Sequence, residues 1–184
     1  DAVHGRVSAR ERGIAVPKDM LDAGNQYLQK LAANDSLGSL DLLRQRAYAV
    51  YLLTRQGNVT TNSLAAVQKR LQDAYPNDWK NDLAAAWLAA SYQLLKQDKE
   101  AAALIASPQA MLERKRASDG GYVTGYYLDP LPRDASGLYL IAKHFPERVR
   151  KLSPRAIDNL AAPLVDNRYN TLSSAMTILA LDAY

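Results

Sequence analysis

Four apolar stretches with helical spacing limit what this chain of 184 residues can fold into. They cover residues 46–57, 84–95, 135–145 and 173–184. The first ends at Gly57, and a glycine at this position commonly terminates a helix. Segments such as 61–75, which are apolar on one side only, alternate with these stretches. The sequence therefore predicts an all-α fold, and more specifically an α/α toroid in which inner and outer helices alternate.

The helical period disappears between residues 117 and 132, where turn formers stand beside β-formers, and helix is expected to resume at Arg133. Asp119, Asp129 and Asp134 flank this irregular loop, and acid–base hydrolysis of glycosides requires a pair of carboxylates. A turn at Asp119 and an ion pair between Asp134 and an arginine explain the same residues without catalysis. The sequence favours this structural interpretation, so no catalytic residue is assigned.

Two further expectations concern helix boundaries and faces. Ser107 and Pro108 have the residue types of an N-cap and a first helical position, so a new helix is expected to begin there. The last apolar stretch should bury one line of side chains, namely Leu172, Ala175, Met176, Leu179 and Ala183.

His4 and His144 are the two histidines, and the sequence contains no cysteine. The lack of cysteine excludes disulfides, thiolate metal ligands and a cysteine nucleophile within this chain. A partly charged His144 at a helix end would complement the helix dipole. Its spacing to Glu147 could suit a metal, but Pro146 interrupts that helix. No metal ligand, cofactor or thioester residue is therefore expected within residues 1–184.

The charge distribution gives no sign of a nucleic-acid partner. The net charge is +4, and basic residues are interspersed with acidic ones apart from the short run at 113–116. A nucleic-acid interface needs a clustered basic stripe or a recognisable binding motif. No apolar run reaches the roughly 18 residues that a membrane-spanning helix needs. The sequence thus predicts neither a nucleic-acid partner nor a membrane segment.

Several passages resemble, in the same order along the chain, the thioester domain of bacterial α2-macroglobulins. They are Ala9-Arg-Glu-Arg-Gly-Ile-Ala-Val-Pro17, Tyr27-Leu28, Ala47-Tyr-Ala-Val-Tyr-Leu-Leu-Thr-Arg-Gln-Gly57, Arg133-Asp134-Ala135, Leu138-Tyr-Leu-Ile-Ala-Lys-His-Phe-Pro146, Tyr169-Asn-Thr-Leu-Ser-Ser-Ala175 and Leu179-Ala-Leu-Asp-Ala-Tyr184. Each passage alone is ordinary helix-packing sequence. Their shared order over nearly the whole chain is more specific.

The resemblance implies an α/α toroid within a large, periplasmic, membrane-anchored protease trap. In that family a Cys-x-Glu-Gln segment forms an internal thioester, and cleavage of a bait region exposes it to a lysine of the attacking protease. Target proteases and neighbouring macroglobulin domains would be the partners. This chain departs from the pattern because it lacks the cysteine. Either the thioester lies upstream of residue 1, or the parent protein has none.

The first residue is not methionine and the last helix has no stop signal, which favours a fragment cut behind the thioester. Residues 1–184 are then expected to form one domain, the C-terminal portion of a thioester-type domain, which acts as a scaffold and not as an enzyme. Two alternatives remain open. One is a helical-repeat module for protein interaction, suggested by the helix pairing at 83–104, and the other is an α/α-toroid hydrolase of glycans.

Overall fold

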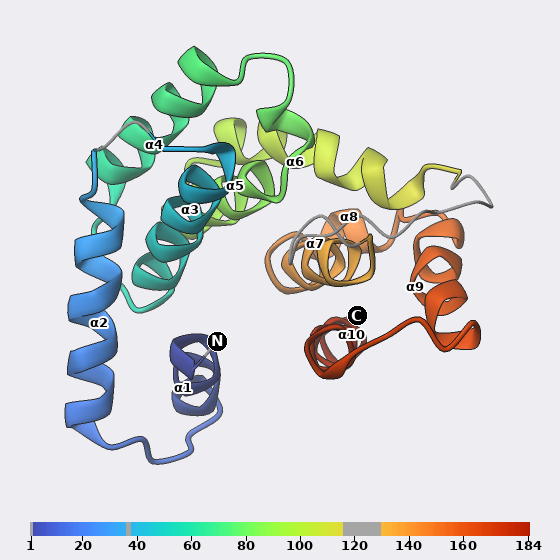
Figure 1. Ribbon diagram of the computed structural model, residues 1–184, viewed down its shortest axis with the longest axis horizontal. Helices are drawn as coiled ribbons and strands as arrows, with labels where there is room; N and C mark the ends of the chain where they lie inside the picture. The colour runs from blue at the N-terminus through green and yellow to red at the C-terminus, as the bar shows by residue number, and fades with distance from the viewer. Residues whose placement is uncertain (1, 36–37, 116–129) are drawn as a thin grey trace.

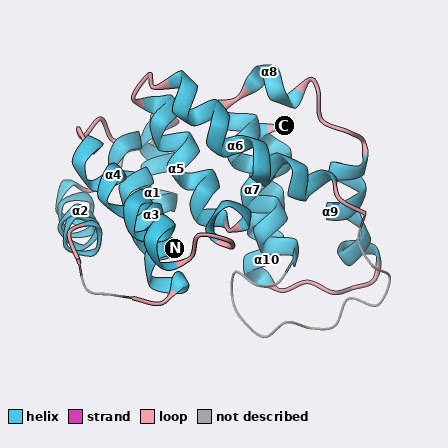
Figure 2. Ribbon diagram, turned by 90° about the horizontal axis from the view of Figure 1, so that it is seen from above, coloured by secondary structure: helices cyan, strands magenta, loops and turns pink. Residues whose placement is uncertain are grey.

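The computed structural model describes residues 2–35, 38–115 and 130–184, and all secondary structure in these ranges is helical (Figures 1 and 2). The elements are α1 (Ala2–Glu11), α2 (Lys18–Ala32), α3 (Leu40–Arg55), α4 (Thr61–Ala74), the 3-10 helix η1 (Trp79–Asn81), α5 (Leu83–Leu94), α6 (Asp98–Glu113), α7 (Pro130–His144), α8 (Pro146–Val149), α9 (Arg155–Val165) and α10 (Thr171–Ala183). The prediction of an all-α fold is confirmed.

The helices are arranged in two layers. Figure 1 shows α1, α3, α5, α7 and α10 around the middle of the molecule, with α2, α4, α6 and α9 outside them. Within the inner layer α3 packs on α5, α5 on α7 and α7 on α10. In the outer layer α2 and α4 cover α3, whereas α6 covers α5 and α7. Inner and outer helices therefore alternate along the chain, and closure into a complete toroid stays a prediction.

Helix α5 is the most enclosed inner helix, because every residue from Leu83 to Tyr92 is buried. Five of these ten residues are alanines, which allow neighbouring helices to approach closely on several sides. The helix begins at Asp82, whose side chain accepts a hydrogen bond of 2.9 Å from the backbone N–H of Ala84. Its burial explains why this stretch shows no single apolar face in the sequence.

The expectation of a new helix at Ser107 and Pro108 is wrong. Helix α6 runs without interruption from Asp98 to Glu113 and carries Pro108 inside it. A proline within a helix removes one backbone hydrogen bond, at a cost of about 3 kcal/mol. Burial of Ile105 and Leu112 on either side of the buried Pro108 offsets this cost, because both leucine-sized side chains enter the core.

The irregular loop also ends earlier than expected. Helix α7 starts at Pro130 and not at Arg133, so residues 130–132 are helical. Pro130 and Pro132 fit the first turn, where a missing backbone N–H leaves no helical bond unmade. Residues 117–129 of the predicted loop lie outside the described ranges.

Helix α10 buries a different line of side chains from the one expected. Ser173, Thr177 and Ala180 are its buried residues, whereas Met176, Leu179 and Ala183 are half-buried and Ala175 is exposed. Three small side chains spaced by three or four residues let the backbone of α10 approach α7 closely. The larger Met176 and Leu179 are only half-buried, although they also pack against the core.

Candidate functional site

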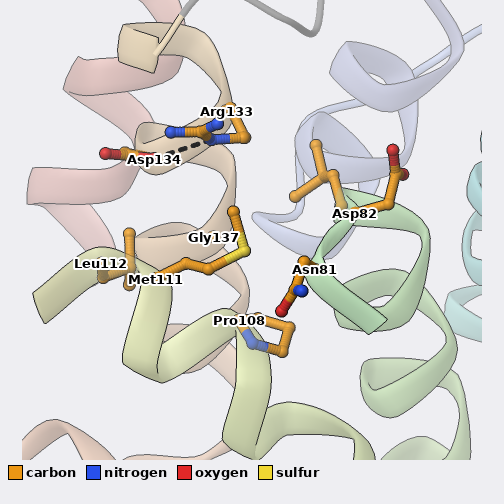
Figure 3. A pocket seen from close by; sticks show the side chains of 9 residues that line it. Asn81, Asp82, Pro108, Met111, Leu112, Arg133, Asp134 and Gly137 are labelled. Atoms are coloured by element: carbon orange, nitrogen blue, oxygen red, sulfur yellow. Dashed lines mark hydrogen bonds and ion pairs between the residues drawn. The ribbon is translucent and has the colours of Figure 1, made fainter. Parts of the chain in front are cut away.

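Asp134, one of the acidic residues singled out in the sequence, takes part in an ion pair. Its carboxylate accepts a hydrogen bond of 3.0 Å from Nε of Arg133, and its side chain is 2% exposed. Figure 3 shows the two side chains turned toward each other, while Asp82 stands across the neighbouring cavity with its carboxylate pointing away from Asp134. The structural interpretation of Asp134 as a partner of arginine is confirmed.

The cavity beside Asp134 is too small for a substrate. It lies between η1, α5, α6 and α7 and has a volume of about 20 Å³, which is room for about one water molecule (Figure 3). A sugar ring does not fit in this space. Asp119 and Asp129, the other two carboxylates considered for hydrolysis, lie outside the described residues.

His144 does not act as a charged complement to the helix dipole, so that expectation is wrong. Its Nε2 atom shares a hydrogen bond of 2.9 Å with the hydroxyl of Tyr51, and the two rings meet edge-on. Burial, reinforced by the charges of Arg55 and Lys143, lowers the pKa of His144 to about 3. The imidazole is therefore neutral at pH 7 and serves as a packing and hydrogen-bonding group.

A cluster of charged groups connects the C-terminal ends of the inner helices α1, α3 and α7. Glu11, at the end of α1, accepts hydrogen bonds of 3.0 and 2.6 Å from the guanidinium of Arg55 on α3. The same carboxylate accepts a hydrogen bond of 2.9 Å from the ammonium of Lys143 on α7. The Arg55 side chain is 1% exposed, so this carboxylate neutralises a charge that water does not reach. We call these three residues the Glu11 clamp.

Aromatic side chains surround the Glu11 clamp on its inner side. The ring of His4 on α1 lies against Tyr48 and Tyr139, and its Nε2 atom shares a hydrogen bond of 3.4 Å with the Tyr139 hydroxyl. Tyr48 in turn packs against Trp87 on α5, with ring centroids 4.7 Å apart. These contacts connect α1, α3, α5 and α7 through partly polar rings that suit a boundary between core and water.

The electrostatics of the cluster follow from burial and from its two cations. Burial alone would raise the pKa of Glu11, but hydrogen bonds from Arg55 and Lys143 lower it to about 2. Burial lowers the pKa of His4 to about 4, and the positive charges of Arg55 and Lys143 act in the same direction. At neutral pH Glu11 is thus ionised and both histidines are neutral.

A cleft opens on the outer side of the Glu11 clamp, between α1, α7 and α10. Its volume is about 320 Å³, and Glu11, Tyr139 and Lys143 form part of its wall. Arg12 and Asp182 also line it and form an ion pair that joins α1 to α10. Charged and apolar side chains both line this cleft, and it is the candidate binding site.

The buried histidines lead to a prediction about acid. Their pKa values in the folded state are about 4 for His4 and about 3 for His144, both below the 6.5 of an unfolded histidine. The unfolded chain therefore binds more protons below pH 6.5, and stability falls as the pH is lowered from there. Between pH 6.5 and 5, we expect a loss of about 3 kcal/mol in the free energy of unfolding, measured by urea denaturation.

A double variant provides the control for this prediction. Replacing both histidines with glutamine leaves a polar side chain at each site but removes the titration. The slope of stability against pH in this window should then become nearly flat. A slope as steep as that of the unchanged chain would contradict the assignment to His4 and His144.

Sequence reasoning did not identify the Glu11 clamp. One feature of the sequence could have pointed to it, because each of its three residues lies in a passage that carries the family resemblance. Glu11 lies in 9–17, Arg55 in 47–57 and Lys143 in 138–146. Asp182, at the rim of the cleft, comes from a fourth passage, 179–184. Passages far apart in the chain thus meet at one place in the fold.

The part of the chain that the structure describes holds neither a metal-binding cluster nor a membrane-spanning helix. No group of three or more histidine, aspartate or glutamate side chains in ranges 2–35, 38–115 and 130–184 is gathered in a way that could hold a metal ion. In the same ranges, no helix combines the length and the apolar character that crossing a membrane requires.

The chain is similar to three curated bacterial proteins. It is 47% identical over 180 residues to an α2-macroglobulin homolog of Yersinia pestis, a match that covers 97% of this chain and 9% of that protein. It is 39% identical over 188 residues to an α2-macroglobulin of Pasteurella multocida, covering 98% of this chain and 10% of the relative. It is 38% identical over 184 residues to an α2-macroglobulin of Rickettsia conorii, a match that covers 100% of this chain and 9% of that protein.

No family model matches the chain, and no solved structure matches it. All three relatives, however, carry the name of an α2-macroglobulin or its homolog, and each match extends over essentially all of this sequence. The chain spans only 9–10% of the length of these relatives. Identity at this level over its full extent assigns the chain, as a segment, to the bacterial α2-macroglobulins.

Proposed function

We propose that the chain is a scaffold portion of the thioester domain of an α2-macroglobulin-like protease inhibitor that traps attacking proteases. It contributes no reactive group of its own and holds the helices on which a thioester from another part of the polypeptide rests. The partners would be target proteases and neighbouring macroglobulin domains, and the location would be the periplasm. The identity to three bacterial α2-macroglobulins along the whole chain carries this proposal.

The arrangement of the helices supports a ring and not an open superhelix. Inner and outer helices alternate (Figure 1). An ion pair between Arg12, directly after α1, and Asp182 on α10 connects the first inner helix to the last. A helical-repeat module would instead leave its first and last helices far apart and present a continuous concave groove. Asp134 is a poor candidate for the catalytic carboxylate of a glycan hydrolase, because it is buried and forms an ion pair with Arg133.

The test uses the full-length protein that carries this sequence. Methylamine attacks an internal thioester, forming an amide with the glutamine-derived acyl group and releasing the cysteine as a free thiol. We expect one thiol to be released per molecule, and we expect a protease mixed with the untreated protein to become covalently attached, as judged by denaturing gel electrophoresis. A protein that releases no thiol and retains no protease would overturn the inhibitor proposal.

The scaffold role has a separate readout. Loosening the inner helices with a substitution in this chain, such as Asp82→Ala, should raise the amount of free thiol before any protease is added, because water would reach the thioester. Glu147→Gln, at a side chain that is 78% exposed, is the matched control and should leave the thiol content unchanged. Equal thiol content in both variants would show that this portion does not protect the reactive centre.

A further inference from the structure

The cleft between α1, α7 and α10 has more positive than negative charge. Its charged wall residues are Glu11, Arg12, Lys143 and Asp182, and Arg55 stands directly behind Glu11. These groups are three cations and two carboxylates, which leaves one positive charge without a counter-charge among the described residues that form the site.

The surplus charge lies at the inner end of the cleft. Arg12 and Asp182 neutralise each other at the rim, where their side chains are 62% and 55% exposed. Further in, Glu11 is shared by two cations, of which Arg55 is 1% exposed and Lys143 32% exposed. A charge in such a partly desolvated place attracts a counter-ion more strongly than one in open water.

One donor at this inner end, the ammonium of Lys143, has capacity for a further partner. Arg55 stands behind the cleft wall, and its buried Nη1 atom has no hydrogen-bond partner among the described residues, so its charge acts on the cleft without touching a ligand there. The ammonium of Lys143 carries three N–H donors, and one of them bonds to Glu11. The positive field of these two residues also reaches His4 and His144 and disfavours their protonation.

The shape of the cleft suits a small organic molecule. Its volume of about 320 Å³ lies at the lower end of the range of ligand pockets. Leu179 and Ala183 on α10 give it an apolar wall, and the ring of Tyr139 lies on the α7 side. A ligand held here would meet a positive charge at one end and apolar surface along its length.

We propose that this cleft binds a small organic carboxylate, with the carboxylate beside the Lys143 ammonium and the apolar tail against Leu179 and Ala183. Hydrogen bonds between an ammonium and a carboxylate are among the stronger ones in proteins. Either a free organic acid or the C-terminus of a peptide can supply such a group. The inference stands apart from the inhibitor proposal, since it concerns only the residues of this cleft.

Titration of the full chain of 184 residues, followed by NMR at pH 7, tests the proposal. Butyrate is the probe, and butyramide is its uncharged counterpart of the same shape. Butyrate should give saturable shifts in the ring signals of His4 and in backbone signals of α1 and α10, whereas butyramide should give none. Lys143→Met should weaken butyrate binding about tenfold or more, as expected for the loss of one charged hydrogen bond.

Two further variants separate binding from folding. Lys143→Arg keeps the charge and should retain binding, and Lys151→Met removes an exposed lysine elsewhere and should have no effect. Equal shifts with butyrate and butyramide, or butyrate binding unchanged by Lys143→Met in a chain with an unaltered circular dichroism spectrum, would overturn the proposal. The absence of saturable shifts with butyrate and with a free-acid peptide would do the same.

A short peptide in its free-acid and amidated forms identifies the source of the carboxylate. Binding of butyrate without binding of either peptide supports a free organic acid as the ligand. Binding of the free-acid peptide but not of its amide supports a peptide C-terminus.

Discussion

Replacing Glu11 with glutamine is expected to lower the free energy of unfolding by about 2–3 kcal/mol, because it leaves a buried arginine without its carboxylate. The Arg55 side chain is 1% exposed, and both of its charged contacts in the Glu11 clamp go to this residue. Glu11 itself is 32% exposed, so solvent screening places the effect below that of a fully buried pair. Urea denaturation monitored by circular dichroism at pH 7 measures the change.

The glutamine variant has a second consequence for the same cluster. Removing the one carboxylate near both cations leaves their field on the histidines unopposed, so the pKa of His4 should fall further. Glu147→Gln changes the same functional group at a side chain that is 78% exposed and should alter stability by less than about 0.5 kcal/mol. If the two variants lost the same stability, the Glu11 clamp would have no structural role.

Replacing Asp82 with alanine is expected to cost still more, about 4 kcal/mol, because this side chain has two functions. It accepts hydrogen bonds of 2.8 and 2.6 Å from the guanidinium of Arg44, and the two side chains are 10% and 6% exposed. It also accepts a bond from the N–H of Ala84 at the start of α5. The variant thus weakens the ion pair between α3 and α5 and removes the cap of the most enclosed helix.

Asp82→Asn separates these two contributions. Asparagine is a good N-cap residue, so this variant keeps the cap and loses the charge. We expect it to be about 1 kcal/mol more stable than Asp82→Ala and about 3 kcal/mol less stable than the unchanged chain, both by urea denaturation. Wild-type stability of Asp82→Asn would show that the ion pair with Arg44 contributes nothing.

The sequence predicted the helical class well where one side of a helix faces water. The apolar line expected at 61–75 was Leu64, Val67, Leu71 and Tyr75, of which the first three are buried in α4 and Tyr75 is half-buried. The helix starts expected at Pro108 and at Arg133 were wrong, because a nearby proline signals only that a backbone N–H is missing. Whether a helix continues through a proline or starts at that proline depends on how much apolar surface the neighbouring helical turns bury.

The buried line of α10 could not be predicted for a related reason. Apolar periodicity favours the largest side chains as the buried ones, but contact distance decides in this case. Helix α10 packs on α7, and its buried residues are the small Ser173, Thr177 and Ala180. Which side chains of α10 are buried depends on the partner helix α7, and the local sequence of α10 carries no information about that partner.

The sequence by itself determined the helical class, the alternation of enclosed and one-sided helices, and the resemblance to α2-macroglobulins, because these depend on local spacing and residue order. The tertiary structure alone decided which charged residues meet. Glu11 and Lys143 are separated by 132 positions, yet Lys143 donates a hydrogen bond to Glu11 where the ends of α1 and α7 meet. Glu11, Arg55 and Lys143 are residue types that usually lie at the surface, and partial burial strengthens the contacts among them in the Glu11 clamp. The strength of an electrostatic contact depends on the surroundings of the charges in the fold and not on their neighbours in the sequence.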